Sequence, residues 1–170
     1  MKNPTFGIAY FLLVIVQMVI CNYFQMSPYF VISILPAMVL CIPLTVSTQM
    51  CMILAFVTGL SVDWLAEGLI GINASALIPV AYARTTVIRV FLGEDLISRK
   101  ETFSFRKNGI GKILTTLLLS YVLFFVVYIF LDGAGTKPFL FNLLRFALSL
   151  ACSIIPGLIV TGSLTKEERR

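Results

Sequence analysis

Residues 48–73 read TQMCMILAFVTGLSVDWLAEGLIGIN, and this stretch decides the fold class. The run from Thr48 to Val62 carries no charge, and Asp63 is the first charged residue after Lys2. A long uncharged apolar run is typical of a helix inside a lipid bilayer. A carboxylate near the end of such a run is costly to place in hydrocarbon, so Asp63 needs a partner, water or a specific function.

The composition of the whole chain agrees with this interpretation. Hydrophobic residues make up 59% of the 170 residues and charged residues 12%, against roughly 45–50% and about a quarter in soluble domains. So few charges do not cover the surface of a water-soluble protein, and we therefore expect an all-α, polytopic integral membrane protein. No polar stretch is long enough to bury its own core, so residues 1–170 are expected to form one domain.

Six membrane-spanning helices are expected. The run between Lys2 and Asp63 is long enough for about three bilayer crossings at ~1.5 Å per residue. The second span is short and carries Pro36, so we expect it to be bent or packed inside the protein. Residues 132–138 have the composition of a loop. The expected spans are residues 5–22, 29–43, 48–66, 73–92, 111–131 and 139–164.

The distribution of basic residues predicts the orientation. If the N-terminus is cytoplasmic, only Lys137 lies in an outer loop, and Arg145 lies within the sixth span. The positive-inside rule therefore predicts that both termini are cytoplasmic. The basic residues then on or near the inner side are Lys2, Arg84, Arg89, Arg99, Lys100, Arg106, Lys107, Lys112, Lys166, Arg169 and Arg170.

Ala55, Gly59 and Asp63 are spaced four apart, which places them along one narrow helix face. Small residues there permit close approach of another helix, so this face is a candidate for a partner helix. Asp63 has three open interpretations: the end of a span at the water interface, half of a buried structural pair, or a partner-binding residue. If it is paired, its depth in the membrane favours Arg145 over Arg84 as the partner.

The segment 93–109 carries Arg99, Lys100, Arg106 and Lys107 with apolar and aromatic residues between them. This pattern favours a segment that lies on an anionic membrane surface. A cytoplasmic protein partner is the alternative. The segment is short and next to the membrane, which argues against nucleic acid.

The residues of catalytic and metal sites are sparse. The chain has no histidine, and Cys21, Cys41, Cys51 and Cys152 are scattered without a C-x-x-C pair. It also has no phosphate-binding glycine loop and no nucleophile elbow. The sequence therefore predicts a protein that is not an enzyme and that has no metal or cofactor.

One stretch carries Ala55, Gly59, Asp63, Gly68, Gly71, Asn73 and Arg84. With these residues it resembles a known family, the rod-shape-determining MreD proteins. These share a Gly-Leu-x-x-Asp end to a central span, a glycine turn and a next span rich in small residues. The resemblance covers roughly residues 55–90 by motif, and elsewhere rests on length, span count and the late basic loop.

The resemblance implies a non-enzymatic scaffold of the bacterial inner membrane that acts in cell elongation. Its implied partners are a bitopic MreC-like protein and, directly or through it, an MreB-type cytoskeleton and a RodA-type polymerase with its penicillin-binding transpeptidase. The family is also similar in fold to the substrate-binding components of energy-coupling-factor vitamin transporters.

That likeness gives the alternative function, a small-molecule binding component of a transporter. Such a component needs an outward cavity with convergent polar groups. Asp63, Glu67, Asn73 and Arg145 are the residues expected to rim it.

Overall fold

The computed structural model describes residues 4–24, 29–67, 70–92, 110–133 and 138–167. In this part the protein is all-α, with six α-helices and one π-helical turn. The elements are α1 (Pro4–Phe24), α2 (Leu35–Cys41), α3 (Thr48–Val62), η1 (Asp63–Glu67), α4 (Ile72–Leu92), α7 (Ile110–Gly133) and α8 (Phe139–Glu167).

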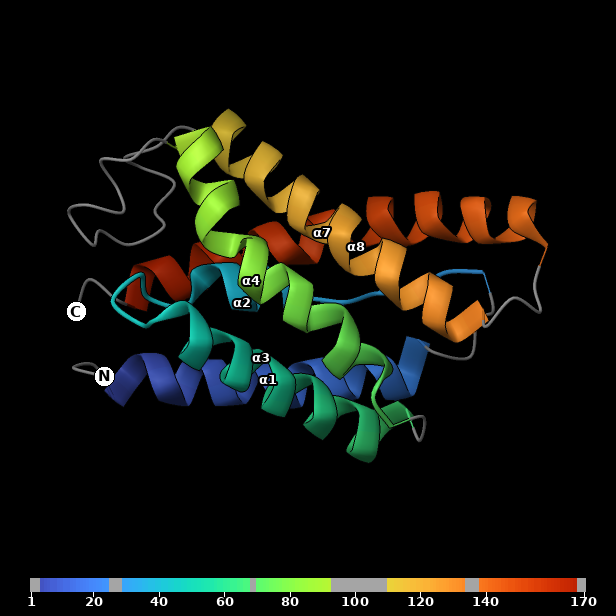
Figure 1. The fold of residues 1–170 in the computed structure, drawn as a ribbon. Helices are drawn as coiled ribbons and strands as arrows, with labels where there is room; N and C mark the ends of the chain where they lie inside the picture. Colours follow the sequence, from blue (N-terminus) through green and yellow to red (C-terminus); the bar gives the residue numbers. More distant parts are fainter. Residues whose placement is uncertain (1–3, 25–28, 68–69, 93–109, 134–137, 168–170) are drawn as a thin grey trace.

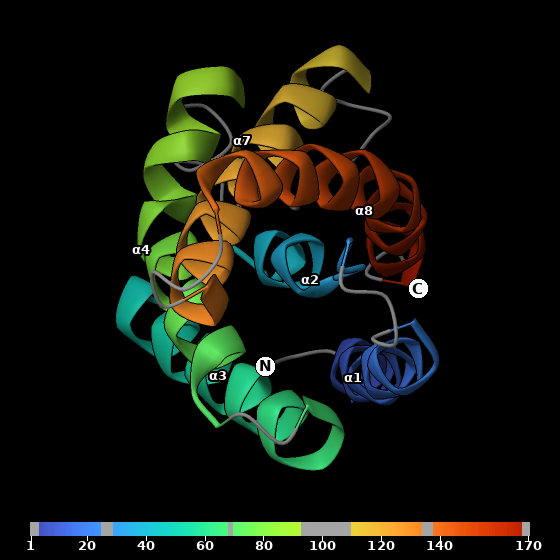
Figure 2. The same ribbon diagram turned by 90° about the vertical axis from the view of Figure 1, so that its right-hand side faces the viewer.

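The short helix α2 lies at the centre of the molecule. Five longer helices, α1, α3, α4, α7 and α8, surround it in the end-on view (Figure 2). All seven residues of α2 are buried. Helix α1 begins and helix α8 ends at the same end of the bundle, and α3 and α4 run antiparallel beside each other (Figure 1).

Four of the described helical segments are long and apolar enough to cross a membrane, which indicates a multi-pass membrane protein. Helix α4 has 21 residues, about 32 Å at ~1.5 Å per residue, but Arg84 and Arg89 lower its hydropathy. The four segments are Phe6–Tyr23, Thr48–Ala66, Gly111–Gly133 and Phe139–Leu164.

The expected helical span over 29–43 is wrong in its extent, because only Leu35–Cys41 is helical. Residues 31–34 before it are non-helical. Pro36 lies in the first turn of α2, where a missing N–H breaks no helical bond, so it does not kink the helix. The expectation that this segment packs inside the protein is confirmed, since every residue of α2 is buried.

The expected loop at 132–138 begins too early. Helix α7 continues to Gly133, so Asp132 is a helical residue at the end of α7. The first span was expected over 5–22 and α1 covers Pro4–Phe24. The last was expected over 139–164 and α8 reaches Glu167.

Candidate functional site

Asp63 is fully buried and caps the start of α4. Its Oδ1 accepts hydrogen bonds from the backbone N–H of Asn73 at 3.0 Å and from Asn73 Nδ2 at 2.9 Å. Its Oδ2 accepts from the N–H of Gly71 at 2.9 Å and of Ala74 at 3.1 Å. The positive end of the α4 dipole and four donors stabilise the carboxylate, although it lies eight or more residues from them in sequence.

Gly71 makes this cap geometrically possible. Its φ is +103°, in the region that favours glycine. The chain turns there so that the backbone N–H groups of Gly71, Asn73 and Ala74 point at Asp63. The glycine and asparagine of the motif at 71–73 therefore belong to one structural unit with Asp63.

The predicted pair between Asp63 and Arg145 is wrong. Arg145 of α8 forms an ion pair with Asp132, the residue before the last of α7. Helices α3 and α8 lie on opposite sides of α2 (Figure 2). The expected similarity of depth therefore did not predict the partner of Asp63. Asp63 is a buried structural residue, but donors from α4, rather than a cation, satisfy it.

The small-residue face of α3 packs inside the chain. Ala55 is fully buried, and a Cβ added to Gly59 would lie 2.5 Å from the Cα of Ala74. Gly59 therefore lets α3 and α4 approach closely, as small residues do between membrane helices. The helix that packs on Ala55 and Gly59 is α4 of the same chain. This face is therefore not accessible to another protein.

The non-helical segment before α2 is held by side chains from two other helices. The N–H of Val31 donates to Ser149 Oγ at 2.9 Å and that of Ser33 donates to Ser153 Oγ at 3.1 Å. Both serines belong to α8. In a membrane interior such bonds matter because no water replaces them.

Gln17 of α1 holds the same segment from the other side. Its Oε1 accepts from the N–H of Ile34 at 2.8 Å, and its Nε2 donates to the carbonyl of Ile32 at 3.3 Å. Gln17 is 1% exposed. Its amide therefore satisfies both a backbone donor and a backbone acceptor, and links α1 to the start of α2.

Arg84 of α4 holds the opposite end of α2. It is buried, and it donates from Nε to the carbonyl of Leu40 at 3.3 Å and from Nη2 to the carbonyl of Ile42. Its Nη1 lies 3.7 Å from Cys51 Sγ. The negative end of the α2 dipole stabilises the guanidinium. Arg84 therefore faces protein and fixes the C-terminus of the central helix.

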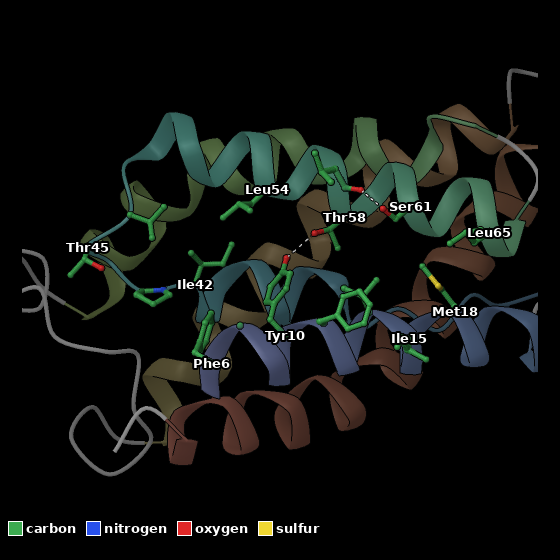
Figure 3. Close-up of a pocket in the computed structure, with 16 residues that line it drawn as sticks. Phe6, Tyr10, Ile15, Met18, Ile42, Thr45, Leu54, Thr58, Ser61 and Leu65 are labelled. Atoms are coloured by element: carbon green, nitrogen blue, oxygen red, sulfur yellow. Dashed lines mark hydrogen bonds between the residues drawn. The ribbon is translucent and has the colours of Figure 1, made fainter. Parts of the chain in front are cut away.

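A long apolar cavity of about 800 Å³ lies between α1 and α3. Phe6, Tyr10 and Met18 line it from α1, and Thr58 and Ser61 line it from α3 (Figure 3). The only polar contact drawn between the two walls is a 3.1 Å hydrogen bond between Tyr10 Oη and Thr58 Oγ1. Its remaining lining residues are Gly7, Phe11, Val14, Ile15, Ile42, Pro43, Thr45, Val46, Leu54, Val57 and Leu65.

The polar rim expected for a transporter site does not assemble from the described residues. Asp63 and Asn73 bind each other, whereas Arg145 binds Asp132. The described residues contain no group of acidic, cysteine or histidine side chains that could hold a metal. Gly68, Arg99, Lys100, Arg106 and Lys107 lie outside the described residues.

Sequence reasoning missed the residues that hold the segment before α2 and those that line the cavity. The signal for these tertiary contacts was a polar residue within an apolar run, as at Gln17, Ser149 and Ser153. A buried polar group in a membrane helix requires a partner, so each such residue marks a tertiary contact. Their partners are backbone groups, which have no signature in the sequence.

Comparison of the chain with protein-family models, with curated proteins and with solved structures gives no match.

Proposed function

We propose that this chain is a non-enzymatic scaffold of the MreD type in the bacterial inner membrane. It crosses the membrane six times with both termini in the cytoplasm. It binds a bitopic MreC-like protein and thereby helps to position peptidoglycan synthesis by a RodA-type polymerase and its penicillin-binding transpeptidase, in register with an MreB-type cytoskeleton. Anionic lipids bind its basic segment at 93–109.

The observation that supports this proposal is the common role of four residues that carry the resemblance, Gly59, Asp63, Gly71 and Asn73. Asp63 accepts hydrogen bonds from Gly71 and Asn73, and Gly59 packs on Ala74. These motif residues join α3 to the start of α4. A motif that specifies a framework rather than a reaction is what a scaffold requires.

The second crossing of the proposed topology consists of the non-helical segment and α2. Six residues from Tyr29 to Ile34 span at most about 20 Å at ~3.3 Å each. The seven residues of α2 add about 10 Å, so the two together reach at most about the ~30 Å hydrocarbon thickness. Irregular backbone is tolerated at membrane depth only where protein buries it, and Gln17, Ser149 and Ser153 supply its hydrogen bonds.

Deletion of the gene in its source cell, with pulse labelling of new peptidoglycan, tests the proposal. We expect the pattern of wall insertion to lose its organisation along the cell and the cell width to increase. Expression of the intact chain from a plasmid should restore both. An unchanged pattern of wall insertion in the deletion strain would contradict the proposed role.

The small-molecule transporter component remains a second candidate because of the cavity between α1 and α3. Its volume of about 800 Å³ falls within the roughly 300–1,000 Å³ range of ligand sites. This candidate predicts that the purified chain retains a small molecule in native mass spectrometry and co-purifies with paired ATPase subunits. Recovery of neither would exclude it.

A further inference from the structure

The cavity between α1 and α3 is a groove whose mouth lies at the surface of the protein. Phe11 and Val57 line it and are 65% and 53% exposed. Its wall on α1 runs from Phe6 to Met18, about 18 Å at ~1.5 Å per residue, which is more than half of the ~30 Å thickness of the hydrocarbon core. Both walls belong to helices that are long and apolar enough to span the membrane. The groove therefore opens sideways to the membrane interior over more than half of the hydrocarbon thickness.

The hydrogen bond between Tyr10 and Thr58 in this groove uses only one of their two hydroxyl hydrogens. Tyr10 and Thr58 carry one hydroxyl hydrogen each, and a single hydrogen bond joins them. In the described part of the chain, no other hydrogen bond is formed by either hydroxyl. Thr58 is 6% exposed. One O–H group is thus left without an acceptor in an apolar wall, which is unfavourable unless an occupant of the groove accepts it.

The neighbouring Ser61 shows the contrast. Its hydroxyl also lines the groove, but it donates to the carbonyl of Val57 at 2.7 Å in its own helix. Ser61 therefore needs nothing from an occupant. Among these three residues, only the Tyr10–Thr58 pair has a hydroxyl hydrogen without an acceptor.

The depth of Tyr10 and Thr58 decides between possible occupants. Thr58 is ten residues from the start of α3, roughly 15 Å along the helix, so the spare donor lies near the middle of the membrane. An acyl chain has no hydrogen-bond acceptor at that depth. A membrane-spanning helix has backbone carbonyls with a second lone pair, and often a polar side chain, all along its length.

We infer that this groove receives one membrane-spanning helix of a bitopic protein, which accepts a hydrogen bond from the Tyr10–Thr58 pair. The inference deepens the proposed function, since it gives the MreC-like partner its docking surface. The groove supplies the length, the lateral opening and the polar complement that such a helix needs. The small-residue face of α3 is excluded as the docking surface because α4 covers it.

Photo-cross-linking in living cells tests the inference with matched positions. A photoreactive amino acid replaces Phe11 or Val57 in the groove, and Leu12 or Phe56 at neighbouring positions outside it. The control residues are also exposed, at 55% and 43%, and they do not line the groove. We expect the groove positions to form an adduct that maps to the membrane-spanning segment of a single-span protein. The control positions should form none with that segment.

The adduct also separates the two proposals. A groove adduct with an MreC-like protein supports both. A groove adduct with an unrelated bitopic protein supports the groove and overturns the proposed function. If the MreC-like protein co-purifies but cross-links only outside the groove, the docking surface is wrong and the function stands. Adducts with lipid alone, with a small molecule, or with a second copy of this chain overturn the groove inference.

Side-chain variants test the hydrogen bond from the Tyr10–Thr58 pair separately from the volume of the groove. The double change Tyr10→Phe with Thr58→Val should lower the cross-linking yield about threefold, the loss expected for one interhelical polar contact. Ser61→Ala removes a groove hydroxyl that is already satisfied, so the yield should stay the same. Ser61→Phe fills the groove and should lower the yield at least tenfold. Equal cross-linking yields in all three variants would contradict docking of the partner helix on Tyr10 and Thr58.

Discussion

Asp63 and Asn73 are joined by two hydrogen bonds to one carboxylate oxygen, from the backbone N–H at 3.0 Å and from Nδ2 at 2.9 Å. The other oxygen binds Gly71 and Ala74. The last turn of one helix is thereby bonded to the first turn of the next. A charge that is costly in hydrocarbon becomes the element that fixes the angle between α3 and α4.

Replacement of Asp63 by Asn should destabilise the protein. The amide presents an NH₂ group, so at least one of the donors from Gly71, Asn73 and Ala74 loses its acceptor. Leaving a buried donor unsatisfied costs about 1–3 kcal/mol, and the measurement is the Tm of the purified protein in detergent. A Tm equal to that of the unmodified chain would show that the cap is not a stabilising contact.

Replacement of Gly59 by Ala should force α3 and α4 apart. The new Cβ would lie 2.5 Å from the backbone Cα of Ala74, and overpacking of this kind costs about 1–3 kcal/mol. Gly111→Ala is the matched control, because nothing lies within 4 Å of its added Cβ. Thermal unfolding of the two variants checks this, and an equal Tm for both would contradict the close approach.

Exchange of charges between Asp132 and Arg145 should restore the stability that either single change removes. Each single reversal places two like charges together in a site where the side chains are 16% and 8% exposed, and a broken buried pair costs roughly 3–5 kcal/mol. The amount of folded protein recovered from membranes is the readout. The corresponding exchange between Asp63 and Arg145 should give no rescue, and rescue there would contradict the observed pairing.

Replacement of both Ser149 and Ser153 by Ala should loosen the segment before α2. The N–H groups of Val31 and Ser33 would lose their acceptors, at about 1–3 kcal/mol each. Ser163→Ala is the control, because its hydroxyl bonds only within its own helix. Faster proteolysis in the region of residues 29–34 in the double variant, but not in the control, is the expected result. Equal rates would count against these bonds.

The sequence predicted the long helices well, and it failed for α2. Lipid requires each long spanning helix to be apolar over a fixed length, so α1, α3, α7 and α8 follow from hydropathy. The run at 29–43 is equally apolar, but a buried non-helical segment and a buried helix have the same composition. Side chains elsewhere, such as Gln17, decide between them.

The candidate site was predictable in its residues but not in their partners. The sequence singled out Asp63, Gly71 and Asn73, and these form one unit. The partner of Arg145 was missed because Asp132 was assigned to a loop, where no helical position fixes its direction. The groove at Tyr10 and Thr58 left no pattern, since a space between two helices depends on how the whole bundle packs.

The most direct test of the proposed scaffold is purification of the tagged chain in mild detergent, with mass spectrometry of the proteins that accompany it. We expect a bitopic MreC-like protein, together with peptidoglycan polymerase and transpeptidase, to be enriched over a purification of an unrelated multi-pass protein. Recovery of paired ATPase subunits in place of these proteins would contradict the scaffold and favour the transporter component.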